Sequence, residues 1–358
     1  MRQLYGAIMN FTDEYEWAVV GAGPAGIAAV GKLLDKGINS NKILWIDPDF
    51  SVGDFGKKWH LVPSNTRVKL FLNFLNECNS FGFLQKDQIF EIEKIPTDET
   101  CNLGIMAEAL QWVTYKLQMK VHFKNDFLTS LKMKNRFWQL DFQNNKQIFS
   151  KNVILATGSE EKTLTYSDLK TIPLEIALNP NKLKDYSNTY TSIAVFGSSH
   201  SAILVLRNIL ENCTNTKVFN FYKSQLCYAL ISGDTILHDN TGLKGTTAQW
   251  AKEHLHGNLP ENLTRIHIED DNFKTELLSC THAIYAIGFQ KRNIQIEGYS
   301  NCEYNPQTGI IGPGLFGFGI AYPELKRDIF GNKEYRVGLW KFMNYLNNIL
   351  PIWLRYSL

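Results

Sequence analysis

The chain has 358 residues, which is enough for two domains that each bury a core. Its 44% hydrophobic and 20% charged residues are ordinary for a globular protein, and this argues against a disordered or fibrous chain. Because 37 basic residues nearly balance 35 acidic ones, the net charge of +2 gives no electrostatic basis for binding nucleic acid, and we expect no such partner.

The first predicted elements form a βαβ unit around a glycine-rich turn. We expect a buried strand, an apolar helix and a second strand at residues 16–20, 27–34 and 43–46. The turn before the helix reads G-x-G-x-x-G, the fingerprint of a dinucleotide-binding fold. Its residues are candidate cofactor contacts, namely Gly21, Gly23, Pro24, Ala25 and Gly26.

Each part of this unit has a physical role. Gly21 permits the tight turn, Gly23 lets a pyrophosphate approach the backbone, and Gly26 lets the helix pack close to the strand. The free N–H groups and positive end of the helix then hold the phosphates. Asp47 ends the second strand about 20 residues after Gly26, where a carboxylate can accept both ribose hydroxyls of an adenosine.

Further along the chain, alternating residues predict a β-meander at 121–149. A strand at 152–155 follows and runs into a turn of small residues, Ala156, Thr157 and Gly158. A similar strand end recurs at 282–289.

A second βαβ unit is predicted at residues 192–222. Its turn has one glycine, but its other residues are small enough for a second pyrophosphate to approach. The candidate contacts are Gly197, Ser198, Ser199, His200 and Ser201. We interpret His200 as a neighbour of the nicotinamide cofactor and not as a general base, with a purely local hydrogen-bonding role as the alternative. The next strand leads to Lys223, which suits the 2′-phosphate of NADP(H), although a solvated loop lysine is equally compatible with the pattern.

Two such units, the second inserted in the first and each closed by an Ala-Thr-Gly-like strand end, resemble the two-dinucleotide-binding flavoproteins. The resemblance implies an α/β fold with two Rossmann-like domains and the cofactors FAD and NADP(H). It implies a discontinuous FAD-binding domain at 1–160 and 290–358, with the NAD(P)H-binding domain at 161–289 inserted in it. Small residues at 314–321 suit a backbone close to a ligand and add Gly319 and Ile320 as candidates, with a surface loop as the alternative.

The branch of the family is indicated by residues 53–69. Disulfide reductases carry a cysteine pair beside the flavin, whereas the six cysteines here are scattered. The segment from Gly53 to Trp59 is similar to a loop of the flavin-containing monooxygenases, which makes Trp59 a candidate cofactor contact. The segment from Pro63 to Lys69 resembles their active-site asparagine segment and assigns that role to Asn65. An asparagine that caps a helix starting near Val68 is the alternative.

The resemblance implies a flavin monooxygenase that uses NADPH and O₂ to oxygenate a small nucleophile through a flavin C4a-(hydro)peroxide. The fingerprint that monooxygenases carry between their two nucleotide units is absent between Ser159 and Thr191. An NAD(P)H:acceptor reductase without oxygenation and a non-catalytic nucleotide-binding flavoprotein therefore remain as alternatives.

The remaining features are expectations about the surroundings of the protein. The eight histidines lack ligand spacing, so we expect no metal site. Acidic residues near the start interrupt any signal peptide and no apolar run is long enough for a transmembrane segment, which favours a cytoplasmic protein with reduced thiols. A C-terminal helix with one apolar face is expected in the core, disturbed at its last turn by Pro351, with a homodimer contact or a membrane-surface role as alternatives.

Overall fold

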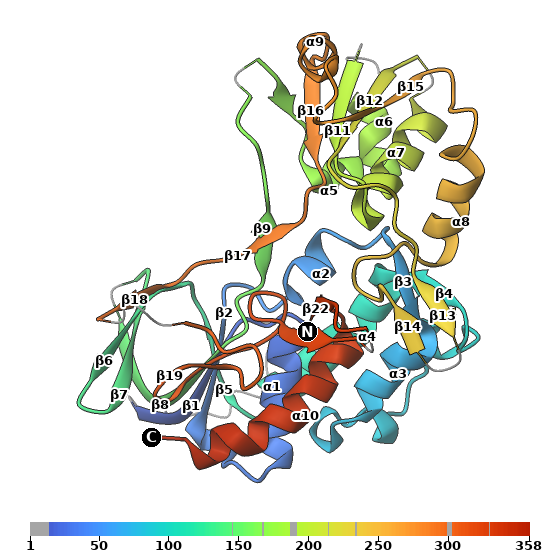
Figure 1. Cartoon of the computed structure of the whole chain (residues 1–358). Helices are drawn as coiled ribbons and strands as arrows, with labels where there is room; N and C mark the ends of the chain where they lie inside the picture. The colour runs from blue at the N-terminus through green and yellow to red at the C-terminus, as the bar shows by residue number, and fades with distance from the viewer. Residues whose placement is uncertain are drawn as a thin grey trace.

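The computed structural model describes residues 14–358 except 145, 167, 187–191, 214, 233–234, 299–302 and 329. Over these residues the chain forms a larger and a smaller α/β domain, which a pair of strands connects (Figure 1). The predicted fold class is confirmed, since the smaller domain is inserted in the larger one and each domain is built around parallel strands.

The larger domain is built on a nine-stranded sheet. Its strands are β1 (Glu14–Val20), β2 (Ile43–Asp47), β5 (His122–Asn125), β6 (Leu128–Lys134), β7 (Phe137–Phe142), β8 (Gln147–Leu155), β18 (Gln295–Glu297), β19 (Ile310–Gly312) and β20 (Leu315–Gly317). The order is β18-β6-β7-β8-β1-β2-β5, and β20 pairs with both β8 and β19.

The predicted meander is confirmed for β6, β7 and β8, which pair in antiparallel fashion. The expectation was wrong for β5, which runs parallel to β2. The physical reason is that a long helix precedes β5, and a helical crossover returns the chain in the same direction.

Helices of the larger domain pack against the sheet and enclose its core. They are α1 (Pro24–Asp35), α2 (Gly53–Lys57), α3 (Val68–Asn76), α4 (Leu103–Gln118) and α10 (Leu339–Arg355). Short 3₁₀ turns lie at Ser40–Lys42, Asn79–Phe81, Phe83–Gln85 and Glu91–Glu93. Two further strand pairs are β3 (Pro63–Arg67) with β4 (Thr100–Asn102), and β21 (Glu324–Arg327) with β22 (Lys333–Arg336).

Helix α10 differs from its prediction in one respect. Its apolar face is buried against α1 and α3, as expected for a core helix. Pro351, however, does not end the helix, which continues to Arg355. A proline near the end removes only one backbone hydrogen bond, and the buried Trp353 ties the last turn to the core by donating from Nε1 to the Thr308 carbonyl at 2.7 Å.

The smaller domain carries a five-stranded, fully parallel sheet in the order β10-β16-β11-β12-β15. The strands are β10 (Lys170–Thr171), β11 (Ser192–Phe196), β12 (Lys217–Tyr222), β15 (Leu263–His267) and β16 (His282–Tyr285). The helices are α5 (Leu174–Ala177), α6 (Pro180–Tyr186), α7 (His200–Asn212), α8 (Gly245–His254) and α9 (Phe273–Leu278). A separate hairpin consists of β13 (Leu230–Ser232) and β14 (Thr235–Leu237).

The chain passes between the domains through β9 (Ser159–Glu161) and β17 (Phe289–Lys291), which pair in antiparallel fashion (Figure 1). The predicted domain boundaries lie in these two strands and stay a prediction. Among the helices that the structure describes, none is long and apolar enough to cross a membrane.

Candidate functional site

Two glycines of the first turn are required by the packing of the backbone itself. A Cβ on Gly21 would lie 2.2 Å from the Ala156 carbonyl oxygen, and a Cβ on Gly26 would lie 1.9 Å from the Gly21 carbonyl oxygen. Gly21 also has φ +107°, which side chains disfavour. The turn after β1 and the turn after β8 are therefore in direct contact, and a cofactor contact of Ala156 stays a prediction.

Gly23 differs, because the described residues leave the space in front of it open. Its φ of −73° is open to any residue, and the nearest atom to an added Cβ is the Val52 carbonyl oxygen at 3.9 Å. No side chain caps the first turn of α1, where Pro24 is the first helical residue. The turn thus combines open space with orphan N–H groups, the surroundings that a pyrophosphate needs.

Asp47 holds this turn in place from the end of β2. It is only 7% exposed, and its Oδ2 accepts from the Ala22 N–H at 2.7 Å. Its Oδ1 accepts from the N–H groups of Asp49 and Phe50 at 3.0 and 2.8 Å. Burial raises the pKa of Asp47 and these hydrogen bonds oppose that rise. Three protein donors leave a carboxylate with further acceptor capacity, so contact with a ribose stays a prediction beside this structural role.

The predicted segment 314–321 also reaches the first turn. The Phe318 N–H donates to the Leu155 carbonyl at 3.0 Å, and a Cβ on Gly319 would lie 2.5 Å from Cβ of Ala25. Gly319, with Ile320 beside it, therefore lies against the start of α1. Three segments that are far apart in the sequence meet at one place.

The other two residues of the turn after β8 contact the strand that returns from the smaller domain. The Thr157 hydroxyl donates to the Arg292 carbonyl at 3.4 Å, and the Arg292 N–H donates to the Gly158 carbonyl at 3.2 Å. These residues connect the first turn with the link between the domains.

The second turn repeats the design of the first. Gly197 has φ +122°, and an added Cβ would lie 2.3 Å from the Ala286 carbonyl oxygen. Helix α7 follows with Ser199 at its N-cap and no side-chain cap. Of the predicted residues, Ser198 lies in this turn and Ser201 in the first turn of α7, and both are partly exposed. Lys223 is exposed just after β12, and its carbonyl accepts from Nε2 of His267 at 2.9 Å.

His200 brings the second turn against the larger domain. It contacts the carbonyl of Pro63 in β3, two residues before Asn65. Burial lowers the pKa of His200, while the hydrogen bond to Pro63 acts in the opposite direction. Its Nδ1 is buried and has no hydrogen-bond partner among the described residues.

Asn65 is partly exposed in β3, where its Oδ1 accepts from the Thr66 hydroxyl at 3.4 Å. The capping alternative was wrong, because Arg67 is the N-cap of α3 and no side chain caps that helix. Asn65 is therefore free for another role in a strand that contacts the second nucleotide turn.

Trp59 lies at the contact between the domains. Its ring meets that of Phe289 edge-on at 6.3 Å, and it packs against the core of the smaller domain. Beside it Lys58 and Glu175 form an ion pair at 3.6 Å across the same contact. The structure thus gives Trp59 a packing role, and its contact with a cofactor stays a prediction.

A polar contact between the domains had no signal in the sequence. Asp239 accepts from Lys244 at 2.7 Å and from Lys341 of α10 at 2.6 Å. Glu334 of β22 accepts from the Thr241 hydroxyl at 2.8 Å. We call these five residues the domain clasp.

The described cysteines do not resemble a redox pair. Cys78, Cys101, Cys227 and Cys280 are free thiols, Cys213 is buried, and Cys302 lies outside the described residues. Burial raises the pKa of Cys280 to about 11, and it also raises the pKa of Cys78, Cys101 and Cys227. Reactive thiols need the opposite shift, so thiol chemistry is disfavoured at these positions. No cluster of potential metal ligands occurs within the described ranges.

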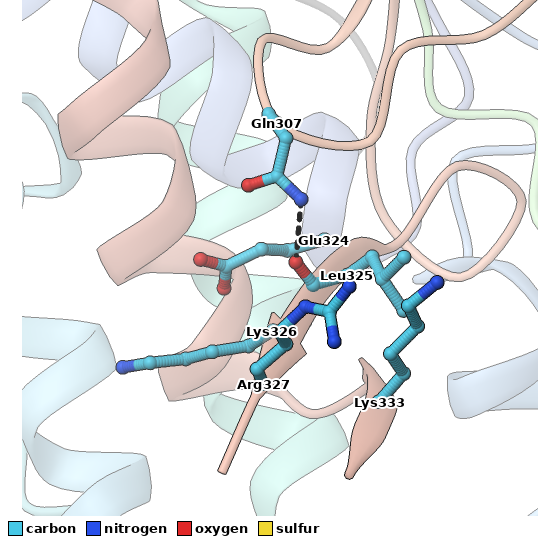
Figure 2. A pocket seen from close by; sticks show the side chains of 6 residues that line it. All are labelled: Gln307, Glu324, Leu325, Lys326, Arg327 and Lys333. Atoms are coloured by element: carbon cyan, nitrogen blue, oxygen red, sulfur yellow. Dashed lines mark hydrogen bonds between the residues drawn. The ribbon is translucent and has the colours of Figure 1, made fainter. Parts of the chain in front are cut away.

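A hollow of about 510 Å³ lies beside the β21–β22 pair and contains none of the predicted site residues. Figure 2 shows its lining, with the Gln307 amide donating to the Leu325 carbonyl at 2.8 Å. The other lining residues are Glu324, Lys326, Arg327 and Lys333. The hollow is therefore separate from the candidate site.

The two turns, each with an open helix N-terminus at the end of a parallel sheet, define the class of two-dinucleotide-binding flavoproteins. Comparisons with solved structures agree on the fold. A flavin-containing monooxygenase from Stenotrophomonas maltophilia superimposes with a TM-score of 0.64 at 13% identity, covering 96% of this chain and 99% of that one. An ornithine N-hydroxylase from Kutzneria sp. 744 gives a TM-score of 0.66 at 12% identity, with the same coverage.

Among curated proteins, Monooxygenase AgnR1 from Paecilomyces divaricatus is 30% identical over 381 aligned positions, which cover 94% of this chain and 97% of that protein. No family model matches the chain. The protein belongs to the same monooxygenase family as this relative and is an oxidoreductase of the two-dinucleotide-binding flavoprotein fold.

Proposed function

We propose that the protein is an FAD-dependent, NADPH-driven monooxygenase that oxygenates a small nucleophile such as an amine or a thioether. The observation that carries the proposal is the pair of phosphate-binding turns of one design in a chain whose relative is a monooxygenase. FAD supplies the chemistry that the side chains lack, since it accepts hydride and passes electrons to O₂.

The residues of each turn fit these cofactors. The open space at Gly23 and the uncapped start of α1 receive the pyrophosphate of FAD, with Gly319 and Ile320 alongside. Gly197 permits the turn before α7 as Gly21 does before α1, and the uncapped start of α7 receives the pyrophosphate of NADPH. We place the domain boundaries in β9 and β17, so that the chain enters and leaves the NADPH domain beside the FAD turn.

Asn65 is the side chain that we assign to oxygenation. Its amide can donate to an oxygen atom and accept from a ribose or flavin group without changing charge. Trp59 and Phe289 pack edge-on at the domain contact, and such packing limits the access of water, which favours oxygen transfer to the substrate over release of hydrogen peroxide. The raised pKa values of Cys78, Cys101, Cys227 and Cys280 support oxygenation over disulfide reduction.

The test is an absorbance spectrum of the purified protein before and after anaerobic addition of NADPH, followed by O₂ and an amine or thioether. We expect a flavin band that bleaches with NADPH and a product that has gained one oxygen atom. Bleaching followed by turnover only with artificial or protein acceptors would instead make the protein a reductase. A flavin band that NADPH does not bleach would leave a nucleotide-binding protein without turnover.

A further inference from the structure

Arg265 of β15 is a half-buried cation that lacks an anionic partner. Its Nε donates to Oδ1 of Asn220 at 3.0 Å, and its guanidinium carbon lies 4.6 Å from the centre of the Tyr222 ring. Its Nη2 is buried and has no hydrogen-bond partner among the described residues, nor does a described carboxylate form an ion pair with it. A buried N–H donor without an acceptor raises the free energy of the folded protein.

Other shielded cations of the chain do have a carboxylate. Lys32 pairs with Glu77 at 3.0 Å, and Arg336 pairs with Glu324 at 2.9 Å. Burial also lowers the pKa of Arg265, and the groups that oppose this effect are the phenols of Tyr222 and Tyr228, not a carboxylate. The difference indicates that an anion from outside the protein completes the surroundings of Arg265.

The position of Arg265 indicates which anion. Arg265 lies opposite Asn220 in the pairing of β12 with β15, and β12 ends at Tyr222 directly before Lys223. In a dinucleotide-binding fold, the adenosine ribose lies at the end of the second strand, which is β12 here. Asn220 in turn donates to the Gly197 carbonyl at 2.8 Å, so a single side chain connects Arg265 with the phosphate turn.

We propose that Arg265 is a coenzyme-specificity residue that binds the 2′-phosphate of NADPH together with Lys223. This inference rests on the proposed function, because it concerns the coenzyme of the same site. The planar guanidinium offers paired donors that match a phosphate, and the Tyr222 ring restricts its orientation. Arg265 is partly exposed, and Lys223, which follows the adjacent strand β12, is exposed.

The test measures binding of 2′,5′-ADP and of 5′-AMP to the purified holoenzyme by isothermal titration calorimetry, without any turnover. We expect the wild-type protein to prefer 2′,5′-ADP. Arg265→Gln keeps a donor for Asn220 but removes the charge, and it should weaken 2′,5′-ADP roughly ten- to a hundredfold while leaving 5′-AMP nearly unchanged. Arg265→Lys should recover part of the preference for 2′,5′-ADP, because a lysine restores the charge but lacks the paired donors of the guanidinium.

The matched control is Arg207→Gln on α7, since Arg207 pairs with Glu211 at 2.9 Å on the surface and should not affect either ligand. Equal loss of both ligands in Arg265→Gln, or a wild-type protein without preference, overturns the inference. If Arg265→Gln fails to fold, Arg265→Lys takes its place, and an unchanged preference for 2′,5′-ADP in that variant overturns the inference. Selective 2′,5′-ADP binding without bleaching of the flavin by NADPH supports the inference and overturns the proposed function instead.

Discussion

Asn65 is the residue on which the choice between oxygenation and electron transfer depends. We expect Asn65→Ala to retain FAD and to be reduced by NADPH at a nearly unchanged rate. Loss of one donor at a site without water costs about 2.7–4 kcal/mol where comparable donors have been removed, so oxygenated product should fall by about a hundredfold or more. The electrons from NADPH should then reduce O₂ to hydrogen peroxide without oxygenation of the substrate.

The measurement compares product, O₂ uptake and peroxide at equal NADPH consumption. Arg67→Ala is the control, because Arg67 is an exposed residue of the same strand and has no assigned role in oxygenation. Unchanged coupling of NADPH to product in Asn65→Ala would remove Asn65 from the reaction.

His200 makes the contact between the domains sensitive to acid. Its pKa is lowered from 6.5, chiefly by burial, so the unfolded chain takes up this proton more readily than the folded one. Stability from this residue is complete above about pH 6.5 and falls as the pH drops from there toward the folded-state pKa. A full unit between the two pKa values corresponds to about 1.4 kcal/mol.

Urea unfolding of wild-type protein and His200→Gln at pH 8 and at pH 5.5 checks this prediction. His122 and His282 also have lowered pKa values, so the difference between the two proteins isolates His200. We expect the wild-type protein to lose more stability than the variant between the two pH values. Parallel losses would assign the acid sensitivity to other groups.

At the scale of elements, the first turn separates the requirements of folding from those of binding. Gly23→Ala adds a methyl group where the protein leaves space, so thermal stability of the apoprotein should stay nearly unchanged while FAD retention falls. Gly26→Ala drives a Cβ into the Gly21 carbonyl and should cost about 1–3 kcal/mol or more even without FAD. Flavin absorbance after dialysis and melting curves of the apoproteins measure both effects. Full flavin content in Gly23→Ala would contradict the assignment of this turn.

The sequence predicts these elements well where a local pattern encodes them. The strand, glycine turn and helix of each unit have fixed spacing, and so both turns and the inserted domain are predictable. The course of β5 and the continuation of α10 past Pro351 depend on packing against distant segments. The contact of Arg265 with Asn220 joins residues 45 positions apart, and no local pattern specifies such a pair.

At the scale of the whole molecule, the domain clasp fixes how the smaller domain sits on the larger one. Asp239→Asn removes the charge that Lys244 and Lys341 share and leaves these two cations close together. We expect the free energy of unfolding to fall by an amount on the order of 2 kcal/mol, which lies between the values for exposed and fully buried ion pairs. Flavin reduction by NADPH should slow, whereas FAD content should not change.

Stopped-flow reduction and flavin content measure these two effects separately. Glu211→Gln breaks only a surface pair and should change neither quantity. A reduction rate in Asp239→Asn equal to that of the wild-type protein would show that the clasp does not orient the domains for hydride transfer.

The insertion of one domain into the other also sets an order of events on the ribosome. Helix α1 emerges early, but α10, which covers it, follows β8 by more than 180 residues. At about 5–20 residues per second, the interval between the appearance of β8 and that of α10 is on the order of 10–40 s, and the apolar face of α1 lacks its cover throughout that interval. The smaller domain is one continuous segment and can fold during that interval. We expect the growing chain to be most prone to aggregation, and most dependent on a chaperone, between the appearance of β8 and that of α10.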